Sequence, residues 1–264
     1  MKLNIVPART GVTWVKQGIS TFWRQPLALS GLFFMFLAVM TIVGMVPVLG
    51  LALALALLPA CSLGLMAASR EAETGKFPMP LVFLSAFRAG RAQLRAMLIL
   101  GVLYGVSFWL IMGVTTLFDG GSFATRYMAG ENPTLEMAQN PATQVAMLVF
   151  LALQMPLSLM FWHAPALVHW HQVSAVKSVF FSLVACLRNF WAFTVFGLVW
   201  LLILLFAILV VTLCAAVLGK PQLVGVALVP VSMMIAAMFF TSTYFTFRDC
   251  FDPGTGEITP WNTA

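Results

Sequence analysis

Charged residues are scarce in this sequence. Only 8% of its 264 residues are Asp, Glu, Lys or Arg, whereas 61% are hydrophobic. A soluble domain carries about 25% charged and about 45–50% apolar residues, because its surface must be hydrated. The composition therefore excludes a soluble protein and predicts an integral membrane protein.

Six long stretches lack charge altogether. Each is long enough to cross the ~30 Å hydrocarbon core of a bilayer as a helix that rises about 1.5 Å per residue. They cover residues 27–46, 51–69, 97–118, 144–167, 191–213 and 223–245. We therefore predict an all-α, polytopic membrane protein with six transmembrane helices. Proton- and sodium-coupled carriers usually keep an ionisable group at membrane depth, so its absence argues against that class.

Patterns for metals, cofactors and disulfides are also lacking. The four cysteines are far apart and form no CxxC pair: Cys61, Cys186, Cys214 and Cys250. Three histidines, His163, His169 and His171, lie near the end of the fourth apolar stretch. Because His169 and His171 are two apart, they point to different sides of a helix. We predict interfacial histidines rather than a metal site, and we expect no cofactor.

Short amphipathic segments precede the apolar pairs. Residues 10–24 have an apolar stripe on one side and Lys16 and Arg24 on the other, and Trp14 and Trp23 suit the headgroup level. A second such segment covers residues 174–189, where Lys177 and Arg188 share one helical face. Both segments are predicted to be helices that lie on the membrane surface.

Residues 80–95 form the most basic of these segments. Taken as one helix, they place Arg88, Arg91 and Arg95 on a single face, at i, i+3 and i+7. We expect this interfacial helix to lead directly into the third span. We also expect the three interfacial helices to lie near one plane at the cytoplasmic surface.

The order of the elements divides the chain into three consecutive units, each with one interfacial helix and one helical hairpin. The units cover about residues 10–69, 80–168 and 174–246. They belong to a single transmembrane domain, residues 1–246, which a polar tail, residues 247–264, follows. Residues 119–143 form the one long polar loop. All three units run in the same direction, which predicts parallel rather than inverted repeats.

The basic residues are unevenly distributed between the two sides of the predicted membrane. Of the 14 Lys and Arg residues, only Arg126 and Lys220 lie on the side opposite to both termini. Lys and Arg accumulate on the cytoplasmic side of membrane proteins, so both termini are predicted to be cytoplasmic. This topology accounts for the net charge of +6, and no nucleic-acid partner is expected.

The basic residues of the interfacial segments are the candidate binding residues. At headgroup depth, each Lys or Arg near an anionic surface contributes ~1 kcal/mol of attraction. We predict contacts with membrane lipids, anionic phospholipids among them, or with a membrane-protein partner for Lys16, Arg24, Arg88, Arg91, Arg95, Lys177 and Arg188. The alternative is that these charges only fix the topology.

The fourth span contains a candidate polar path. Gln154 and Ser158 are four residues apart and flank Pro156, so they could line a route for a solute. Polar groups in such positions more often hydrogen-bond to a neighbouring helix or to carbonyl groups that a proline has freed.

Three stretches carry a resemblance to a known family. They are VPARTGVTWVKQGISTFWRQP (residues 6–26), ASREAETGK (residues 68–76) and FRDCF (residues 247–251). On these stretches the chain resembles an uncharacterised family of proteobacterial inner-membrane proteins, which implies a place in the bacterial inner membrane. More loosely, SAVKSVFFSLVACLRNFWAF (residues 174–193) is similar to a segment of the membrane domain that accompanies some glycerophosphodiester phosphodiesterases. That similarity implies six helices and an interfacial helix but no catalytic residues, because the phosphodiesterase chemistry belongs to a separate soluble domain.

The sequence favours a non-catalytic function. The first hypothesis is a membrane scaffold or accessory subunit with a basic cytoplasmic face that binds lipids or a partner. The alternative is a passive channel or a carrier for apolar or lipidic solutes. An enzyme that acts on lipid headgroups is disfavoured, because Glu71 and Glu73, which we place in a loop, have no accompanying nucleophile, base or metal ligands.

Overall fold

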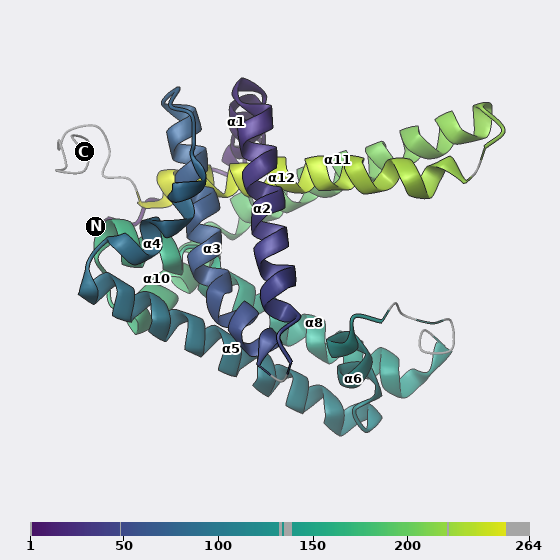
Figure 1. Ribbon diagram of the computed structural model, residues 1–264, viewed down its shortest axis with the longest axis horizontal. Helices are drawn as coiled ribbons and strands as arrows, with labels where there is room; N and C mark the ends of the chain where they lie inside the picture. The colour runs from purple at the N-terminus through teal and green to yellow at the C-terminus, as the bar shows by residue number, and fades with distance from the viewer. Residues whose placement is uncertain (1, 48, 132–133, 135–138, 221, 252–264) are drawn as a thin grey trace. The chain divides into compact units, whose positions relative to one another are not determined.

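The computed structural model describes residues 2–47, 49–131, 134, 139–220 and 222–251 (Figure 1). Within these ranges every regular element is a helix. The elements are α1 (Thr10–Arg24), α2 (Pro26–Gly44), α3 (Gly50–Glu73), the 3₁₀ helix η1 (Pro80–Leu84), α4 (Ser85–Arg88), α5 (Arg91–Asp119), α6 (Ser122–Ala129), α8 (Pro141–Trp162), α9 (Ala164–His171), α10 (Ala175–Arg188), α11 (Phe190–Val217) and α12 (Leu223–Phe251). The all-α fold class is confirmed.

Six segments of the described chain are long and apolar enough to cross a membrane: α2, α3, α5, the pair α8–α9, α11 and α12. They coincide with the six predicted spans. The fourth span is interrupted at His163, between α8 and α9, just before Pro165. Pro165 has no N–H group to donate to the carbonyl of Phe161, so one helical hydrogen bond is missing at this interruption.

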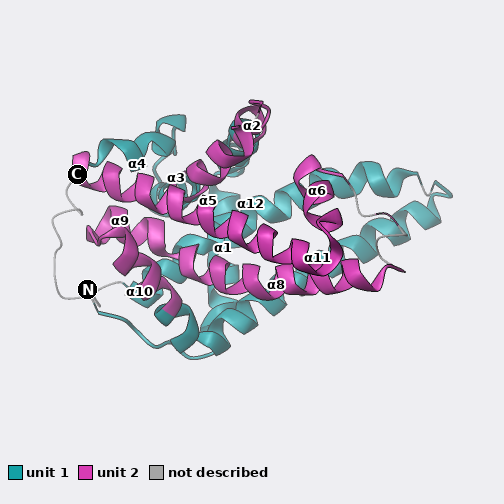
Figure 2. Cartoon of the chain, turned by 90° about the horizontal axis from the view of Figure 1, so that it is seen from below, with its two compact units in different colours: residues 1–39, 61–89, 184–264 teal, residues 40–60, 90–183 magenta. Residues whose placement is uncertain are grey.

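The chain forms two compact units (Figure 2). Unit 1 contains residues 1–39, 61–89 and 184–264, and unit 2 contains residues 40–60 and 90–183. The three consecutive units that we predict from the sequence stay a prediction. Within unit 1, helix α1 packs against α11 and α12, which come from the other end of the chain.

Two glycines allow helix α1 to approach α11 and α12 closely. A Cβ atom on Gly11 would lie 2.7 Å from the backbone nitrogen of Phe196, and one on Gly18 would lie 2.7 Å from the Cα atom of Ser242. Helices in membranes often use such small residues to bring their backbones together. The buried side of α1 consists of Gly11, Trp14, Val15, Gly18, Thr21 and Phe22.

The bounds predicted for the first amphipathic helix are correct, but the position predicted for Trp14 is wrong. Trp14 is 0% exposed, and its ring lies 5.2 Å from that of Phe193. Trp23, by contrast, is 57% exposed. Gly11 and Gly18 lie on the packed side of α1, next to Trp14. A hydropathy pattern does not identify that side as packed, because it counts glycine as neither apolar nor polar.

The prediction of one continuous helix over residues 80–95 is also wrong. The segment consists of η1 and α4, and α5 begins only at Arg91. Gly90 separates them with φ 112° and ψ 165°, a conformation that residues with a side chain rarely adopt. Arg88 therefore precedes the break and does not share a helical face with Arg91 and Arg95.

In unit 2, helix α5 packs along α8 and also contacts α6 and α9. Gly101 of α5 lies close to α3, since a Cβ atom there would be 3.0 Å from the carbonyl carbon of Ala56. Four aromatic rings join α5, α6 and α8, and the rings of Tyr127 and Phe150 are 5.1 Å apart. The cluster consists of Phe108, Phe123, Tyr127 and Phe150.

The two predicted polar segments contain more helix than expected. Helix α6 lies within the loop of residues 119–143, and the Asp119 carboxylate accepts hydrogen bonds from the backbone N–H groups of Gly121 and Phe123, at 3.0 and 2.6 Å. Residues 132–133 and 135–138 of that loop lie outside the described residues. Helix α12 continues to Phe251, which is 1% exposed. The predicted tail is thus helical at its start, and residues 252–264 lie outside the described part.

Candidate functional site

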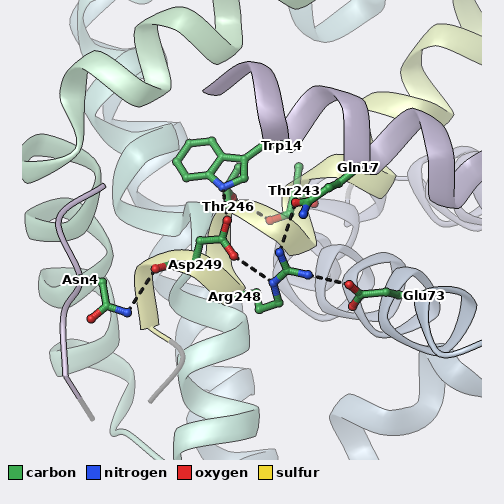
Figure 3. A network of polar contacts seen from close by, with 8 residues as sticks. All are labelled: Asn4, Trp14, Gln17, Glu73, Thr243, Thr246, Arg248 and Asp249. Atoms are coloured by element: carbon green, nitrogen blue, oxygen red, sulfur yellow. Dashed lines mark hydrogen bonds and ion pairs between the residues drawn. The ribbon is translucent and has the colours of Figure 1, made fainter. Parts of the chain in front are cut away.

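A polar network in unit 1 is centred on the guanidinium group of Arg248 (Figure 3). Its Nη1 atom lies 2.6 Å from Oε1 of Glu73, and its Nε atom lies 2.9 Å from Oδ1 of Asp249. Its Nη2 atom donates to Oε1 of Gln17 at 3.2 Å. The guanidinium carbon also lies 5.0 Å from the ring centroid of Phe245. Arg248 thus joins α1, α3 and α12 within this unit.

The second carboxylate oxygen of Asp249 bonds to the buried tryptophan. The indole Nε1–H of Trp14 donates to Oδ2 of Asp249 at 2.9 Å. A buried indole N–H that lacks an acceptor is unfavourable by about 1–3 kcal/mol. Asp249 is therefore the group that makes the buried position of Trp14 possible.

The extended segment before α1 bonds to the end of α12. The backbone N–H of Asn4 donates to the carbonyl of Cys250 at 2.9 Å, and the Asn4 side chain donates to the carbonyl of Asp249 at 3.3 Å. Carbonyl groups in the last turn of a helix have no partner within the helix. The N-terminal segment therefore caps α12.

Asn189, the residue just before α11, is 2% exposed and fixes the same segment. Its Oδ1 atom accepts from the backbone N–H of Val6 at 2.8 Å, and its Nδ2 atom donates to the carbonyls of Asn4 at 3.0 Å and Ala185 at 3.1 Å. Nearby, burial raises the pKa of the Cys186 thiol, which marks a packed side chain rather than a reactive one.

Our sequence interpretation missed this network. Glu73 is the last residue of helix α3, rather than a loop residue, and Arg248 and Asp249 belong to α12 rather than to a tail. The available signal was the scarcity of acidic residues, of which the chain has only eight. Glu73 and Asp249 are among those that lie at the ends of spans, next to apolar sequence, where an unpaired charge is unfavourable.

We expect the Trp14→Phe substitution to destabilise the protein by about 1–2 kcal/mol, because it removes a hydrogen bond to a carboxylate and preserves most of the ring. The free energy of unfolding, measured by reversible denaturation in mixed detergent micelles, tests this. Trp23→Phe is the matched control, since Trp23 is 57% exposed, and it should change stability by less than about 0.5 kcal/mol. Equal effects of the two substitutions would contradict the role given to the Trp14 indole.

The predicted lipid-contact residues occupy exposed positions. All seven basic side chains are exposed: Lys16, Arg24, Arg88, Arg91, Arg95, Lys177 and Arg188. Arg24 donates from Nη1 to the backbone carbonyl of Glu73 at 3.1 Å. Within the described residues none of the seven belongs to a salt bridge, whereas Arg248 pairs with two carboxylates. Their positive charge is not neutralised by those parts of the chain.

One of the seven, Arg95, lines a groove in unit 2. The groove has a volume of about 320 Å³ and lies between the start of α5 and the turn from α9 into α10. Its polar lining comes from Gln93, Arg95, Gln172 and Ser174, and its apolar lining includes Ile99. Ligand sites in proteins range from about 300 to 1,000 Å³, so the volume suits a small group.

Gln172 in this groove has an unusual backbone conformation. With φ 53° and ψ 33° it is left-handed, and among the described residues it is the one non-glycine residue with positive φ. It ends helix α9, and the N–H of Val173 donates to the carbonyl of Leu167 at 3.3 Å. Glycine usually fills this position at a helix end.

The structure also places the remaining candidate residues. The Ser158 hydroxyl donates to the backbone carbonyl of Gln154 at 2.9 Å, within α8. His163 is buried rather than interfacial, and its backbone N–H donates to the Ser182 hydroxyl at 2.9 Å. The described residues contain no group of three or more His, Cys, Asp or Glu side chains that could hold a metal ion.

A curated relative matches the chain over almost its whole length. It is a protein of Burkholderia thailandensis named a "probable inner membrane protein", which is 39% identical over 265 residues that cover 98% of each chain. The chain belongs to this family. No family model matches the chain, and no solved structure matches it.

Membership in this inner-membrane protein family agrees with the helices. The relative's name indicates the membrane, and the six long apolar helices of the described chain indicate several passes through it. The protein is thus a multi-pass protein of an inner-membrane family, as the resemblance in the sequence implies.

Proposed function

We propose that the protein is a non-catalytic scaffold or accessory subunit of the inner membrane, and that its basic cytoplasmic face binds anionic phospholipids or a membrane-protein partner. The exposure of the seven basic side chains carries this proposal. Among the acidic residues within the described chain, Glu73 and Asp249 instead pair with Arg248, and Glu131 pairs with Arg126. Free positive charge at headgroup depth attracts anionic lipids, with ~1 kcal/mol for each residue.

The orientation belongs to the same proposal. With 14 Lys and Arg residues, and only Arg126 and Lys220 on the far side of the predicted topology, both termini lie in the cytoplasm. The basic face then meets the cytoplasmic leaflet, whose surface potential is negative. Topology alone could account for the charges, so the experiment must separate orientation from lipid binding.

Replacing Arg88, Arg91 and Arg95 by glutamine should separate the two. We expect the orientation to stay the same, because Arg70 and Lys76 keep positive charge between the second and third spans. We expect less phospholipid to co-purify, and less thermal stabilisation by phosphatidylglycerol, because up to ~3 kcal/mol of attraction is lost. Lipid extraction and thermal melting of the purified protein measure these effects.

Two controls accompany this experiment. Reporter fusions at Gly130 and at the C-terminus should show opposite compartments in both the natural protein and the variant. Phosphatidylcholine should stabilise both proteins equally. Unchanged lipid retention and unchanged lipid-dependent melting in the variant would show that these arginines act only as topology signals.

The channel or carrier alternative has weaker support. The Ser158 hydroxyl bonds to the Gln154 carbonyl of its own helix, at 2.9 Å, as serine often does in membrane helices. The hydroxyl hydrogen of Ser158 is thus already bonded within the helix, so it is not available to donate to a solute on a polar path. A flux assay on liposomes that contain the purified protein separates this alternative from the scaffold. The looser similarity to the membrane domain that accompanies some glycerophosphodiester phosphodiesterases stays a prediction.

A further inference from the structure

The groove of unit 2 continues into an apolar stripe along helix α5. Ile99, which lines the groove, is followed on the same helical face by three exposed apolar side chains. Residues at i, i+4, i+7, i+11 and i+15 lie within about 80° of one another on a helix. Starting from Arg95, these positions are Ile99, Val102, Val106 and Leu110, which are 40%, 59%, 53% and 65% exposed.

The charge of the groove is positive. Its lining residues contain one charged side chain, Arg95, and no Asp or Glu is among them. A second cation, the exposed Lys177, lies two residues after the lining residue Ala175, in the first turn of α10. Gln93 and Gln172 add amide groups that can both donate and accept hydrogen bonds.

We propose that this groove binds the headgroup of one anionic glycerophospholipid from the cytoplasmic leaflet, and that an acyl chain of that lipid lies along the apolar stripe of α5. The Arg95 guanidinium pairs with the phosphate, for which its planar fork of donors is suited. The amides of Gln93 and Gln172 bond to hydroxyl groups of the headgroup. The proposal rests on the proposed function, since it requires the basic face to meet the cytoplasmic leaflet.

The shape of the surface favours a membrane lipid over a soluble phosphate ester. A soluble ester would use only the polar end, whereas the stripe from Ile99 to Leu110 extends the site in the direction of the span. The groove volume of about 320 Å³ is at the small end for ligand sites. It therefore suits a headgroup, with the acyl chains outside it.

The backbone conformation of Gln172 is a second observation that supports this site. A left-handed backbone conformation is unfavourable for a residue with a side chain, and such strain tends to occur where a side chain has a role. Glycine would relieve it at this helix end, yet the chain has a glutamine there, and this glutamine is one of the groove-lining residues. Binding and folding are thus expected to favour different residues at this position.

The test compares Arg95→Gln with Arg91→Gln in the full-length protein. Both arginines are exposed and belong to the same helix, but only Arg95 lines the groove. Native mass spectrometry in a zwitterionic detergent, with phosphatidylglycerol as the probe, gives the dissociation constant. Arg95→Gln should raise it about tenfold through loss of a charge-assisted pair. Arg91→Gln should raise it less than about threefold, because only screened, long-range attraction is lost.

A third variant, Gln172→Gly, should change stability and binding in opposite directions. It should raise the melting temperature of the lipid-free protein, because it relieves the strained backbone. It should also weaken phosphatidylglycerol binding about threefold or more, because the amide is lost. A variant that changes only stability would show that Gln172 has no part in the site.

The outcomes distinguish this proposal from the proposed function. If Arg95→Gln and Arg91→Gln weaken binding equally, the groove is not the site, although the basic face still binds lipid. If the natural protein binds phosphatidylglycerol no better than phosphatidylcholine, both proposals are wrong. Glycerol 3-phosphate should bind at least about tenfold more weakly than the lipid, because it lacks the acyl chains. Equal binding would overturn the assignment to a membrane lipid.

Discussion

Gly18→Ala should be among the most destabilising single-methyl changes in this protein, with an expected loss of about 3 kcal/mol in the free energy of unfolding. A Cβ atom on Gly18 would lie 2.7 Å from the Cα atom of Ser242 and 3.0 Å from its backbone nitrogen. These are backbone atoms of α12, so no side-chain rotation can make room. Helix α1 would have to move away from α12 and would lose the contacts of its whole buried side.

The direction of the stability change in Gly18→Ala tests whether α1 is packed against α12. Alanine is a better helix former than glycine by about 1 kcal/mol, so the substitution would stabilise α1 if α1 were free on the membrane surface. Gly197→Ala in α11 is the matched control, since no atom lies within 4 Å of a Cβ placed there. That variant should be neutral or slightly more stable. Denaturation in mixed micelles measures both, and a stable Gly18→Ala variant would contradict the packing of α1.

The features that could be predicted from the sequence are those that depend on composition over a whole turn or more. Six uncharged stretches of about 20 residues can only be spans, because a bilayer offers no partner for an exposed backbone. The bounds of α1, Thr10–Arg24, follow from an amphipathic pattern of the same length. Both predictions sum many small contributions, so single exceptions do not matter.

The errors occur where one residue decides the structure. Gly90 breaks the predicted helix over residues 80–95 through a single dihedral angle, φ 112°. Trp14 is buried because Gly11 and Gly18 let its side of α1 pack closely. A hydropathy pattern gives each glycine little weight, although the absence of a side chain is what permits both arrangements.

The candidate sites could be predicted only in part. The seven basic residues are recognisable from their local context, and all are exposed. The groove is not recognisable, because its lining comes from two stretches, residues 92–99 and 168–175, that are about 70 residues apart. Their proximity depends on the packing of α9 against α5, which no local pattern encodes.

The three stretches that carry the family resemblance come together in the polar network. The opening stretch supplies Trp14 and Gln17, the second supplies Glu73, and the closing stretch supplies Arg248 and Asp249. Residues from all three stretches thus meet where α1, α3 and α12 are joined within unit 1.

The ion pair between Arg248 and Glu73 should contribute more to stability than any other pair in the described chain. Its atoms are 2.6 Å apart, and the two side chains are only 24% and 28% exposed. Arg248→Gln would remove the guanidinium partner of the Glu73 and Asp249 carboxylates in a half-buried site. We expect a loss of about 3 kcal/mol in the free energy of unfolding, because removal of one partner of a buried pair is strongly destabilising.

A double-mutant cycle identifies the cause of that loss. Glu73→Gln alone should be unfavourable by about 1 kcal/mol, and the double variant should be more stable than the sum of the single effects implies, by about 1–2 kcal/mol. The pair Arg126–Glu131 is the control, since its atoms are 4.0 Å apart and its side chains are 41% and 57% exposed. Its coupling energy should be below about 0.5 kcal/mol, as for surface pairs in general. Additive effects at Arg248 and Glu73 would show that the guanidinium acts through its contacts with Gln17, Asp249 and the Phe245 ring, and that α3 is not held by this pair.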